Sequence, residues 1–331
     1  MGTAVSLLVV NFRSAALALD AIRSARETTR NPLQVVVVDN SDEADALRGA
    51  ADVYVNMGRN AGYAAAINRG RAECGGEVIV AANPDVLFAP GAIDALVETN
   101  AAVAGPALFW DDAHEWLLPP AELHTSYEVL SRALATRSRA FAARRDRRRI
   151  RARIAFWSLT ETTPVRALSG AVMAIRASAF DDAGGLDERF PLYFEENDFL
   201  RRVRGDVVYV PSARVRHLYN QSAGESAEAA AFYALSEAAY LRKWGGIFWK
   251  NLDGGQALLP VLWGDRQECL SSTELLVEAS PLPDFETAAG TFTTTWPITL
   301  PADIRAAYRG SELYLRAVDR STARVLAKIR A

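Results

Sequence analysis

The feature that most constrains the fold is a repeated pattern in the N-terminal part of the chain, in which a short apolar run ends in polar side chains. The first run ends in Asn11, the second in Asp39, and a later one in the tripeptide Asn83-Pro84-Asp85. Such continuous runs of valine and leucine predict strands that are buried on both faces. Helical patterns lie between the runs, so the sequence predicts βαβ units and a mostly parallel sheet.

The expected elements divide the chain into two parts. Residues 1–250 are expected to form an α/β domain, with residues 110–158, where the alternation of strand and helix is lost, as an arginine-rich insert. Residues 256–331 carry short strand patterns punctuated by prolines, which predict a small antiparallel β domain of unknown role. The predicted strands are 5–12, 35–38, 52–56, 78–82, 101–107, 207–210, 213–217, 272–279, 291–298 and 312–318. The predicted helices include 14–25, 89–100, 178–183, 195–204 and 225–244.

An acidic segment in the second half of the larger domain is a candidate for chemistry. Glu195, Glu196 and Asp198 crowd the predicted start of a helix, directly after two aromatic residues. Acids favour helix N-termini because the helix dipole is positive there, so a purely structural role is one interpretation. Three acids are more than a cap needs, however, and a carboxylate that faces a cleft can act as a general base.

Asp85 and His217 are the predicted ligands of a divalent cation. Asp85 follows a buried strand and is a hard oxygen ligand suited to Mg²⁺ or Mn²⁺. His217 ends a later strand, and a neutral imidazole there would favour Mn²⁺. The structural alternatives are an Asx-Pro turn and a histidine that only packs. A carboxylate-held metal beside a second carboxylate that serves as base is suited to moving a group off a diphosphate.

Asn11 and Asp39 lie at the carboxyl ends of predicted strands, where the ligands of such sheets bind. The Asp39 carboxylate can accept a hydrogen bond from the N3–H of uracil or thymine, and a role in a turn or helix cap explains it equally well. Asn60 and Gly62 open the next helix, where backbone amides can approach a phosphate. Turn chemistry is again the alternative, because neither a dinucleotide fingerprint nor a P-loop is present.

The composition of the chain limits the classes of binding partner and the cellular locations that we expect. The formal net charge of −3 excludes a general attraction to nucleic acid. Arginines crowd residues 137–153, which predicts either a site for an anionic acceptor or a membrane surface, or else a solvated helix face. Two cysteines cannot form a disulfide framework, and the early apolar run is too short to span a bilayer. We therefore expect a cytoplasmic protein, with peripheral membrane contact through residues 137–153 left open.

Several short motifs follow one another in a fixed order. They are Val9-Val10-Asn11-Phe12, Val38-Asp39-Asn40-Ser41, Asn60-Ala61-Gly62-Tyr63, Asn68-Arg69-Gly70, Asn83-Pro84-Asp85, Leu168-Ser169-Gly170-Ala171, Gly185 through Asp198, and Val210-Pro211 with Val215-Arg216-His217. This set, over roughly residues 3–245, resembles the family 2 glycosyltransferases of the GT-A fold, and within them the rhamnosyltransferase-type bacterial enzymes. Each motif is weak alone, whereas the ordered set is specific to the family.

The resemblance implies roles for the matching residues. Asp39 would contact the pyrimidine, and Asn83-Pro84-Asp85 is a variant of the family's Asp-x-Asp metal motif, with His217 at the metal side. Asn83 in place of aspartate removes one negative charge from the metal site. Glu196 occupies the position of the family's catalytic base, which is usually aspartate, and Glu195 and Asp198 are the alternatives. The residues implied for nucleotide binding are Val10, Asn11, Phe12, Asp39, Asn60, Gly62, Asn68 and Asn83.

The expected function is that of an inverting, metal-dependent glycosyltransferase that uses Mn²⁺ or Mg²⁺ and a dTDP- or UDP-linked sugar. By the resemblance, rhamnose or a related deoxyhexose is the expected donor sugar. The acceptor is a hydroxyl of a glycan, a lipid-linked sugar or a natural product. Two alternatives stay open: a sugar nucleotidyltransferase, and a binding or scaffold protein with a decayed GT-A site. The C-terminal domain is a candidate for contacts within a homo-oligomer.

Overall fold

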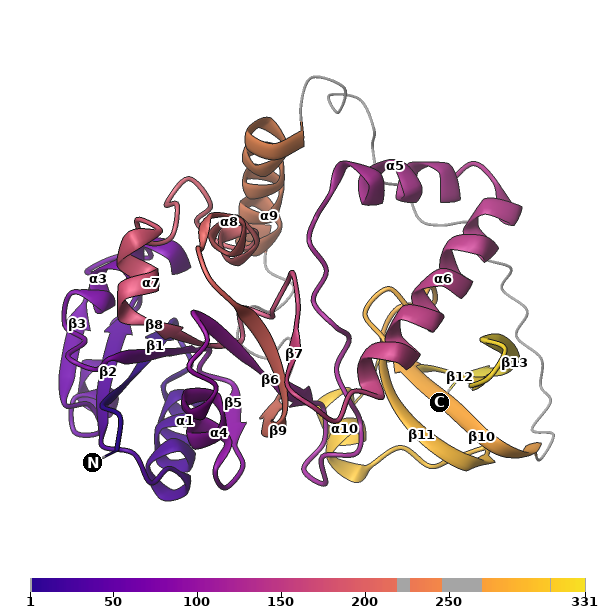
Figure 1. Cartoon of the computed structure of the whole chain (residues 1–331), viewed down its shortest axis with the longest axis horizontal. Helices are drawn as coiled ribbons and strands as arrows, with labels where there is room; N and C mark the ends of the chain where they lie inside the picture. The colour runs from indigo at the N-terminus through magenta and orange to yellow at the C-terminus, as the bar shows by residue number, and fades with distance from the viewer. Residues whose placement is uncertain (1, 219–226, 246–269, 310, 331) are drawn as a thin grey trace. The chain divides into compact units, whose positions relative to one another are not determined.

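The computed structural model of the chain consists of two compact units (Figure 1). The structure describes residues 2–218, 227–245, 270–309 and 311–330. The described residues of the first unit are 2–108, 121–124, 160–218 and 227–245, and those of the second are 109–120, 125–159, 270–309 and 311–330. Most of the segment expected as an insert therefore groups with the C-terminal sheet.

The first unit is built on a mixed, nine-stranded sheet. Its strands are β1 (Val5–Asn11), β2 (Leu33–Asp39), β3 (Val53–Asn56), β4 (Val78–Ala82), β5 (Val86–Phe88), β6 (Val103–Phe109), β7 (Thr163–Pro164), β8 (Val172–Arg176) and β9 (Val207–His217). The order is β3-β2-β1-β4-β8-β6-β9-β5, and β7 pairs with β9 off this path. β1 to β4 pair in parallel, whereas β8 joins β4 antiparallel and β5 joins β9 antiparallel. The predicted α/β fold is confirmed.

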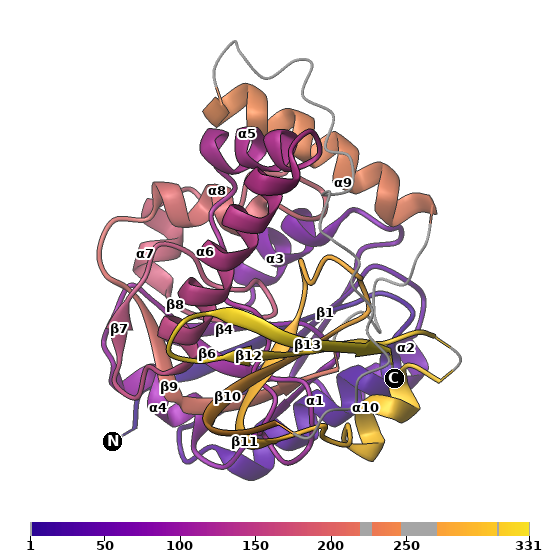
Figure 2. The same cartoon turned by 90° about the vertical axis from the view of Figure 1, so that its right-hand side faces the viewer.

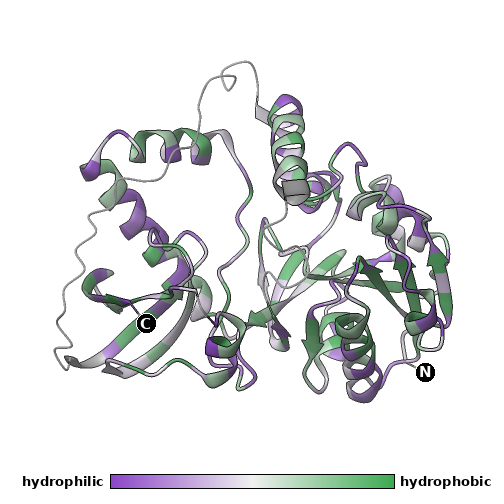
Figure 3. Cartoon of the chain, turned by 180° about the vertical axis from the view of Figure 1, so that it is seen from behind, coloured by the Kyte–Doolittle hydropathy of each residue, from purple (hydrophilic) through white to green (hydrophobic). Residues whose placement is uncertain are grey.

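Helices cover both faces of this sheet. Helix α1 packs Ile22 and its buried alanines into the core that contains Leu7. Helix α3 lies so close to the sheet that a Cβ atom on Gly70 would be 2.3 Å from Cδ1 of Leu8. Successive side chains of a strand point to opposite faces, so α1 and α3 lie on opposite sides. Hydrophobic strands and more hydrophilic helix surfaces are visible in Figure 3. The helices are α1 (Ala15–Thr28), α2 (Ala44–Leu47), α3 (Tyr63–Arg71), α4 (Ala92–Glu98), α7 (Ala177–Asp182), α8 (Glu195–Arg202) and α9 (Ala227–Tyr240).

The second unit is a four-stranded antiparallel sheet with a long helix packed against it, which confirms the predicted β domain. The order is β11-β10-β12-β13, from β10 (Leu270–Ser280), β11 (Ala289–Trp296), β12 (Tyr314–Asp319) and β13 (Arg324–Arg330). Helix α6 (Arg139–Trp157) packs Ile150 and Trp157 against Leu276 and Val318. Figures 1 and 2 show α6 running from this sheet to α5 (Ser126–Ala135). A short helix, α10 (Ala302–Ala307), completes the unit.

Some elements differ from the prediction. Residues 207–217 form one strand rather than a pair, because the backbone stays extended through Pro211-Ser212. Strands β5 and β13 were not predicted, since the first has only three residues and the second alternates with arginine and lysine. The predicted start of the helix at residue 225, the domain boundary near residue 250 and Cys269 lie outside the described residues. No helix in the described parts of the chain is long and apolar enough to cross a membrane.

Candidate active site

The carboxyl ends of β1 and β2 bring Asn11 and Asp39 together. The two residues are paired in the sheet register, and Asn11 Nδ2 donates to Asp39 Oδ1 at 2.9 Å. Both are fully buried. The Asp39 carboxylate also accepts hydrogen bonds from the Ser41 amide and hydroxyl, from the Glu43 amide and from Tyr54. These donors use its lone pairs within the protein, as the turn-forming interpretation predicts. Contact with a pyrimidine stays a prediction.

The same donors explain the charge state of Asp39. Burial alone would raise its pKa, but hydrogen bonds from Ser41, Glu43 and Asn11 outweigh burial and hold the pKa below its usual value. Asp39 therefore stays ionised at neutral pH. Its neighbours in the predicted nucleotide site differ in accessibility, since Val10 is buried in the sheet whereas Phe12 is only partly buried.

Asp85 and His217 meet because the short strand β5, which follows β4 in the chain, pairs with the end of β9. After β4 the chain turns through Asn83-Pro84 and enters β5, whose Val86 is the register partner of His217. The Leu218 amide donates to the backbone oxygen of Asp85 at 3.0 Å. As a result, His217 Nε2 lies 3.3 Å from Asp85 Oδ1, and both side chains are buried. The structure thus brings together the two residues that the sequence predicted as metal ligands.

This pair has the chemistry of a small cation site. A carboxylate and an imidazole can both bind a first-row divalent metal, and the nitrogen favours Mn²⁺ over Mg²⁺. Among the described residues no group of three or more acidic, histidine or cysteine side chains is arranged to hold a metal ion. A metal at Asp85 and His217 would therefore need further ligands from a substrate, which is the usual arrangement where a cation binds a diphosphate.

The acidic segment begins helix α8 from a strained turn. Tyr193 and Phe194 precede the helix with φ values of 68° and 67°, which L-residues rarely adopt and which cost about 1–3 kcal/mol each. Phe194 is anchored by aromatic contacts to Tyr240 and His124, with ring centroids 5.3 and 5.0 Å apart. This packing holds the turn and fixes where Glu195 and Glu196 point.

Glu195 and Glu196 differ in access to solvent. The Glu195 side chain is buried, and its Oε2 atom has no hydrogen-bond partner among the described residues. Burial raises the pKa of Glu195 well above its usual value, and the adjacent Glu196 raises it further. Glu196 is only partly buried and accepts a hydrogen bond from Asn197 Nδ2 at 3.0 Å. Its pKa is also raised by burial. Glu196 is therefore the more accessible carboxylate.

Asp198, the third predicted acid, is held by cations. Its carboxylate lies 2.8 Å from Arg202 Nε, 2.6 Å from Lys243 Nζ and 2.8 Å from Trp244 Nε1, and it is fully buried. These bonds connect α8 to the π-helical segment η1 (Leu241–Gly245) that follows α9. The arrangement gives Asp198 a structural task, and leaves Glu195 and Glu196 as the acids without cationic partners in the described chain.

Tyr63 links the acid pair to Asp85, and sequence reasoning did not single it out. Burial raises its pKa, and so do the charges of Glu195, Glu196 and Asp85, so all three carboxylates act on one phenol. Its hydroxyl lies 3.4 Å from the backbone oxygen of Gly170. The signal in the sequence was its place in the Asn60-Ala61-Gly62-Tyr63 motif, where only the asparagine and glycine were assigned a role.

Gly170 lies at the centre of the site. A Cβ atom added there would be 3.6 Å from Cβ of Glu196, so the glycine backs directly onto that side chain. The next residue, Ala171, accepts a backbone hydrogen bond from Asn83 at 2.8 Å. The turn before β8 therefore connects the end of β4, with its metal motif, to the start of α8, with its acids.

Two of the predicted nucleotide residues, Gly62 just before α3 and Asn68 within it, hold the acidic segment in place. Gly62 has φ +88°, and a Cβ atom there would lie 2.7 Å from the backbone oxygen of Pro191, so only glycine fits. Asn68 Nδ2 donates to the Leu186 oxygen at 2.9 Å, and its Oδ1 accepts from the Leu186 amide at 2.9 Å. Asn60 accepts a hydrogen bond from the Gly62 amide. Nucleotide contacts by these residues stay predictions.

Comparison with known proteins shows which family the chain resembles. The sequence model of glycosyl transferase family 2 matches residues 6–157. Curated relatives from two strains of Mycobacterium tuberculosis, named N-acetylglucosaminyl-diphospho-decaprenol L-rhamnosyltransferase, are 29% identical over 280 residues, which are 76% of this chain and 86% of theirs.

Solved structures with some similarity include GalNAc-T7 with UDP, GalNAc and Mn²⁺ (16% identity, TM-score 0.47, 66% of this chain and 44% of that one). Another is the mannosyltransferase PcManGT from Pyrobaculum calidifontis with GDP-Man and Mn²⁺ (16% identity, TM-score 0.46, 78% of this chain and 66% of that one). The family match and the curated relatives agree with the ordered motifs and the α/β fold. Residues 6–157 of this chain thus match the glycosyl transferase family 2 model, which is the family that the ordered motifs resemble.

Proposed function

We propose that this glycosyltransferase moves a sugar from a nucleoside diphosphate donor to a hydroxyl of its acceptor, with inversion and with the help of a divalent metal. The observation that carries the proposal is the grouping of Asp85 and His217, 3.3 Å apart, with the acid pair Glu195-Glu196 around Tyr63 and Gly170. One half of this group suits a cation and the other half suits a base.

Asp85 and His217 are the residues that would hold the metal. Their oxygen and nitrogen donors suit Mn²⁺, and Mg²⁺ is the alternative. When bound, the cation would offset charge on the departing diphosphate, an effect worth several kcal/mol. Asn83 leaves the site with one carboxylate fewer than the family's motif, so we expect weak binding of the free metal.

Glu196 is the proposed base. It is the more accessible of the two glutamates and backs onto Gly170, where the absence of a side chain leaves room beside the carboxylate. Burial raises its pKa, which makes the carboxylate a better proton acceptor near neutral pH. Glu196 would take the proton of the acceptor hydroxyl as that oxygen attacks, and its buried neighbour Glu195 would keep the site's proton affinity high.

The curated relatives direct the choice of substrates. Their printed name describes rhamnosyl transfer to a diphosphate-linked N-acetylglucosaminyl lipid. We propose the same classes for this chain: rhamnose or a related deoxyhexose carried on dTDP or UDP, and a lipid-linked sugar as acceptor. The protein would then work at the cytoplasmic face of a membrane.

The proposal is tested with purified full-length protein, dTDP-rhamnose or UDP-linked sugars, and a diphosphate-linked N-acetylglucosamine lipid, with Mn²⁺ or with chelator. We expect metal-stimulated release of nucleoside diphosphate and a product whose anomeric configuration is the opposite of the donor's. Release of pyrophosphate from a nucleoside triphosphate and a sugar phosphate would instead identify a nucleotidyltransferase. If no donor is turned over or hydrolysed under any condition, the decayed binding protein is the better explanation.

A further inference from the structure

Helix α6 carries two rows of arginine, one buried and paired with glutamates and the other exposed. Arg145, Arg149 and Arg153, spaced four residues apart, are buried. Arg145 and Arg149 pair with Glu286, and Arg153 Nη1 donates to Glu278 at 2.7 Å. The helix face that packs on the sheet is therefore neutralised within the second unit.

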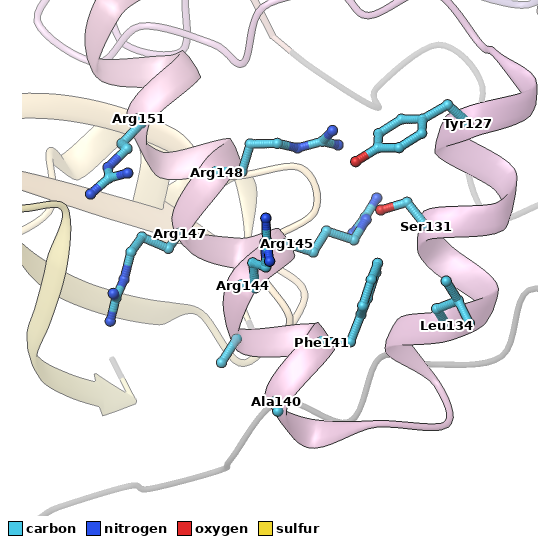
Figure 4. A pocket seen from close by; sticks show the side chains of 11 residues that line it. Tyr127, Ser131, Leu134, Ala140, Phe141, Arg144, Arg145, Arg147, Arg148 and Arg151 are labelled. Atoms are coloured by element: carbon cyan, nitrogen blue, oxygen red, sulfur yellow. The ribbon is translucent and has the colours of Figure 1, made fainter.

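The other row is Arg144, Arg147 and Arg151, spaced three and four residues apart on the outer face of the helix. All three are exposed, and none forms an ion pair with a carboxylate of the described chain. Figure 4 shows Arg147 and Arg151 pointing away from α5. Residues 126–157 contain ten arginines and two acids, whereas the whole chain has a net charge of −3, so positive charge is concentrated on this hairpin.

Helix α5 adds an exposed apolar face beside the arginines. Tyr127, Leu130 and Leu134 follow one another at helical spacing and are 58%, 42% and 38% exposed. The small residues of the helix, such as Ala133 and Ala135, take the buried side. This is the reverse of a normal surface helix, whose large apolar residues face the core.

A groove of about 850 Å³ lies between the two helices. Figure 4 shows Tyr127 and Ser131 of α5 facing Arg148, Arg145 and Phe141 of α6. Arg148 lies over the Tyr127 ring, 4.8 Å from its centroid, and also pairs with Glu128. These contacts fix the hairpin, and the same groove is lined by Tyr127 and Leu134 together with Arg144, Arg147 and Arg151.

We propose that the α5–α6 hairpin is a membrane-docking surface, on which Arg144, Arg147 and Arg151 bind the phosphates of anionic phospholipids while Tyr127, Leu130 and Leu134 enter the interface. Guanidinium groups bind phosphate with paired hydrogen bonds. An amphipathic helix with tyrosine and leucine beside arginine is suited to lie in the plane of a bilayer surface. The exposed leucines argue for lipid rather than nucleic acid, which would gain nothing from them.

The test is co-sedimentation of the full chain with vesicles of phosphatidylcholine alone or of phosphatidylcholine with phosphatidylglycerol. We expect binding to the anionic vesicles only, and weaker binding as salt is raised. Changing Arg144, Arg147 and Arg151 to alanine should lower the partition coefficient by about fivefold for each charge removed. Alanine has high helix propensity and the three side chains are exposed, so the variant should fold. Circular dichroism checks this.

A matched control removes three exposed arginines elsewhere, by Arg23→Ala, Arg305→Ala and Arg324→Ala. We expect it to bind anionic vesicles nearly as well as the parent protein. Equal losses in both triple variants would overturn the proposal, because net charge alone would then explain binding. Unchanged binding of the α6 variant would also overturn it.

A second variant, with Leu130→Ser and Leu134→Ser, should lose the part of the binding that survives high salt. Sedimentation velocity tests whether the hairpin instead binds a second copy of the chain. If the parent protein self-associates, ignores vesicles and becomes monomeric in the arginine variant, the surface belongs to a second copy and the membrane proposal fails. Vesicle binding is measured without donor or acceptor, so its failure would leave the proposed reaction untouched.

Discussion

Glu278 of the second unit and Glu195 of the first are both buried, but their surroundings balance charge in opposite ways. In the second unit, Glu278 lies between Arg153 and Arg316, hydrogen-bonded at 2.7 and 2.5 Å, so the charge is neutralised by the protein itself. In the first unit, Glu195 is buried beside Glu196, and neither forms an ion pair with a described residue. Buried charge is costly unless it is paired. This contrast supports the proposal that the unpaired acids act on a substrate.

The largest effect should follow from Glu196→Gln, which keeps the shape of the side chain and removes the proposed base. We expect transfer to fall by about 10²- to 10⁴-fold with little change in thermal stability. The measurement is the initial rate of nucleoside diphosphate release in the presence of acceptor. The matched control is Glu27→Gln, at an exposed acid on α1, which should leave the rate unchanged.

Parent-like turnover in the Glu196→Gln protein would remove this residue from the mechanism. Catalysis would then no longer explain why Glu196 is accessible and has no cationic partner in the described chain. A larger loss in Glu195→Gln than in Glu196→Gln would move the role of base to the buried glutamate.

Asp85→Asn should have the next largest effect, since it removes the carboxylate that faces His217. We expect loss of roughly two orders of magnitude in rate together with loss of the response to Mn²⁺, because the carboxylate is the charged ligand of the proposed site. Asn83→Asp provides the opposite change and should tighten Mn²⁺ binding, measured by calorimetry. If metal titrations of both variants match the parent protein, the metal site lies elsewhere.

The site could be predicted from the sequence wherever a motif coincides with a strand end. Asp85 and His217 were predicted as ligands from short motifs 132 positions apart, and the pairing of β5 with β9 does bring them together. That three-residue strand could not be predicted, because its pattern is too short to distinguish from a turn. Tyr63 was missed for a related reason, since its importance comes from burial beside residues that are distant in the chain.

The arginine-rich helix shows a different limit of sequence reasoning. Its charge run predicted either a solvated face or an anion site, and the structure divides the run between a buried, paired row and an exposed row. Helical spacing alone could have separated Arg145, Arg149 and Arg153 from the others. Their partners Glu278 and Glu286 lie far along the chain, however, so only the folded structure shows which row is neutralised.

Glu278 is the buried glutamate with cationic partners, and Glu278→Gln should destabilise the second unit. It would leave Arg153 and Arg316 buried without their shared carboxylate, and breaking a buried ion pair from one side costs about 3–5 kcal/mol. Chemical denaturation followed by circular dichroism measures the change. Exposed Glu312→Gln is the control and should have little effect. A stable Glu278→Gln protein would show that the paired charges contribute nothing.

The smallest effect that we expect is on the pH dependence of stability. As the pH rises, ionisation of Glu278 should stabilise the fold and ionisation of Glu195 should destabilise it. Burial would raise the pKa of Glu278, but Arg316 and Arg153 more than compensate and lower it. Its contribution to stability is therefore present above its usual pKa of 4.5 and is lost as the pH falls through the folded value. For Glu195 the folded pKa is raised by burial and by Glu196, so its contribution is largest at low pH and is lost as the pH rises.

Glu195→Gln should consequently stabilise the protein, because glutamine resembles the protonated acid and has no charge to bury. The gain in melting temperature should be near zero at pH 4.5 and should grow as the pH rises through the raised pKa of Glu195. Thermal unfolding across this range measures it, with Glu278→Gln as the opposing case, whose destabilisation should shrink at acid pH. A Glu195→Gln protein that is destabilised equally at every pH would mean that the carboxylate is satisfied within the fold. Glu195 would then resemble Glu278, and the contrast between the units would disappear.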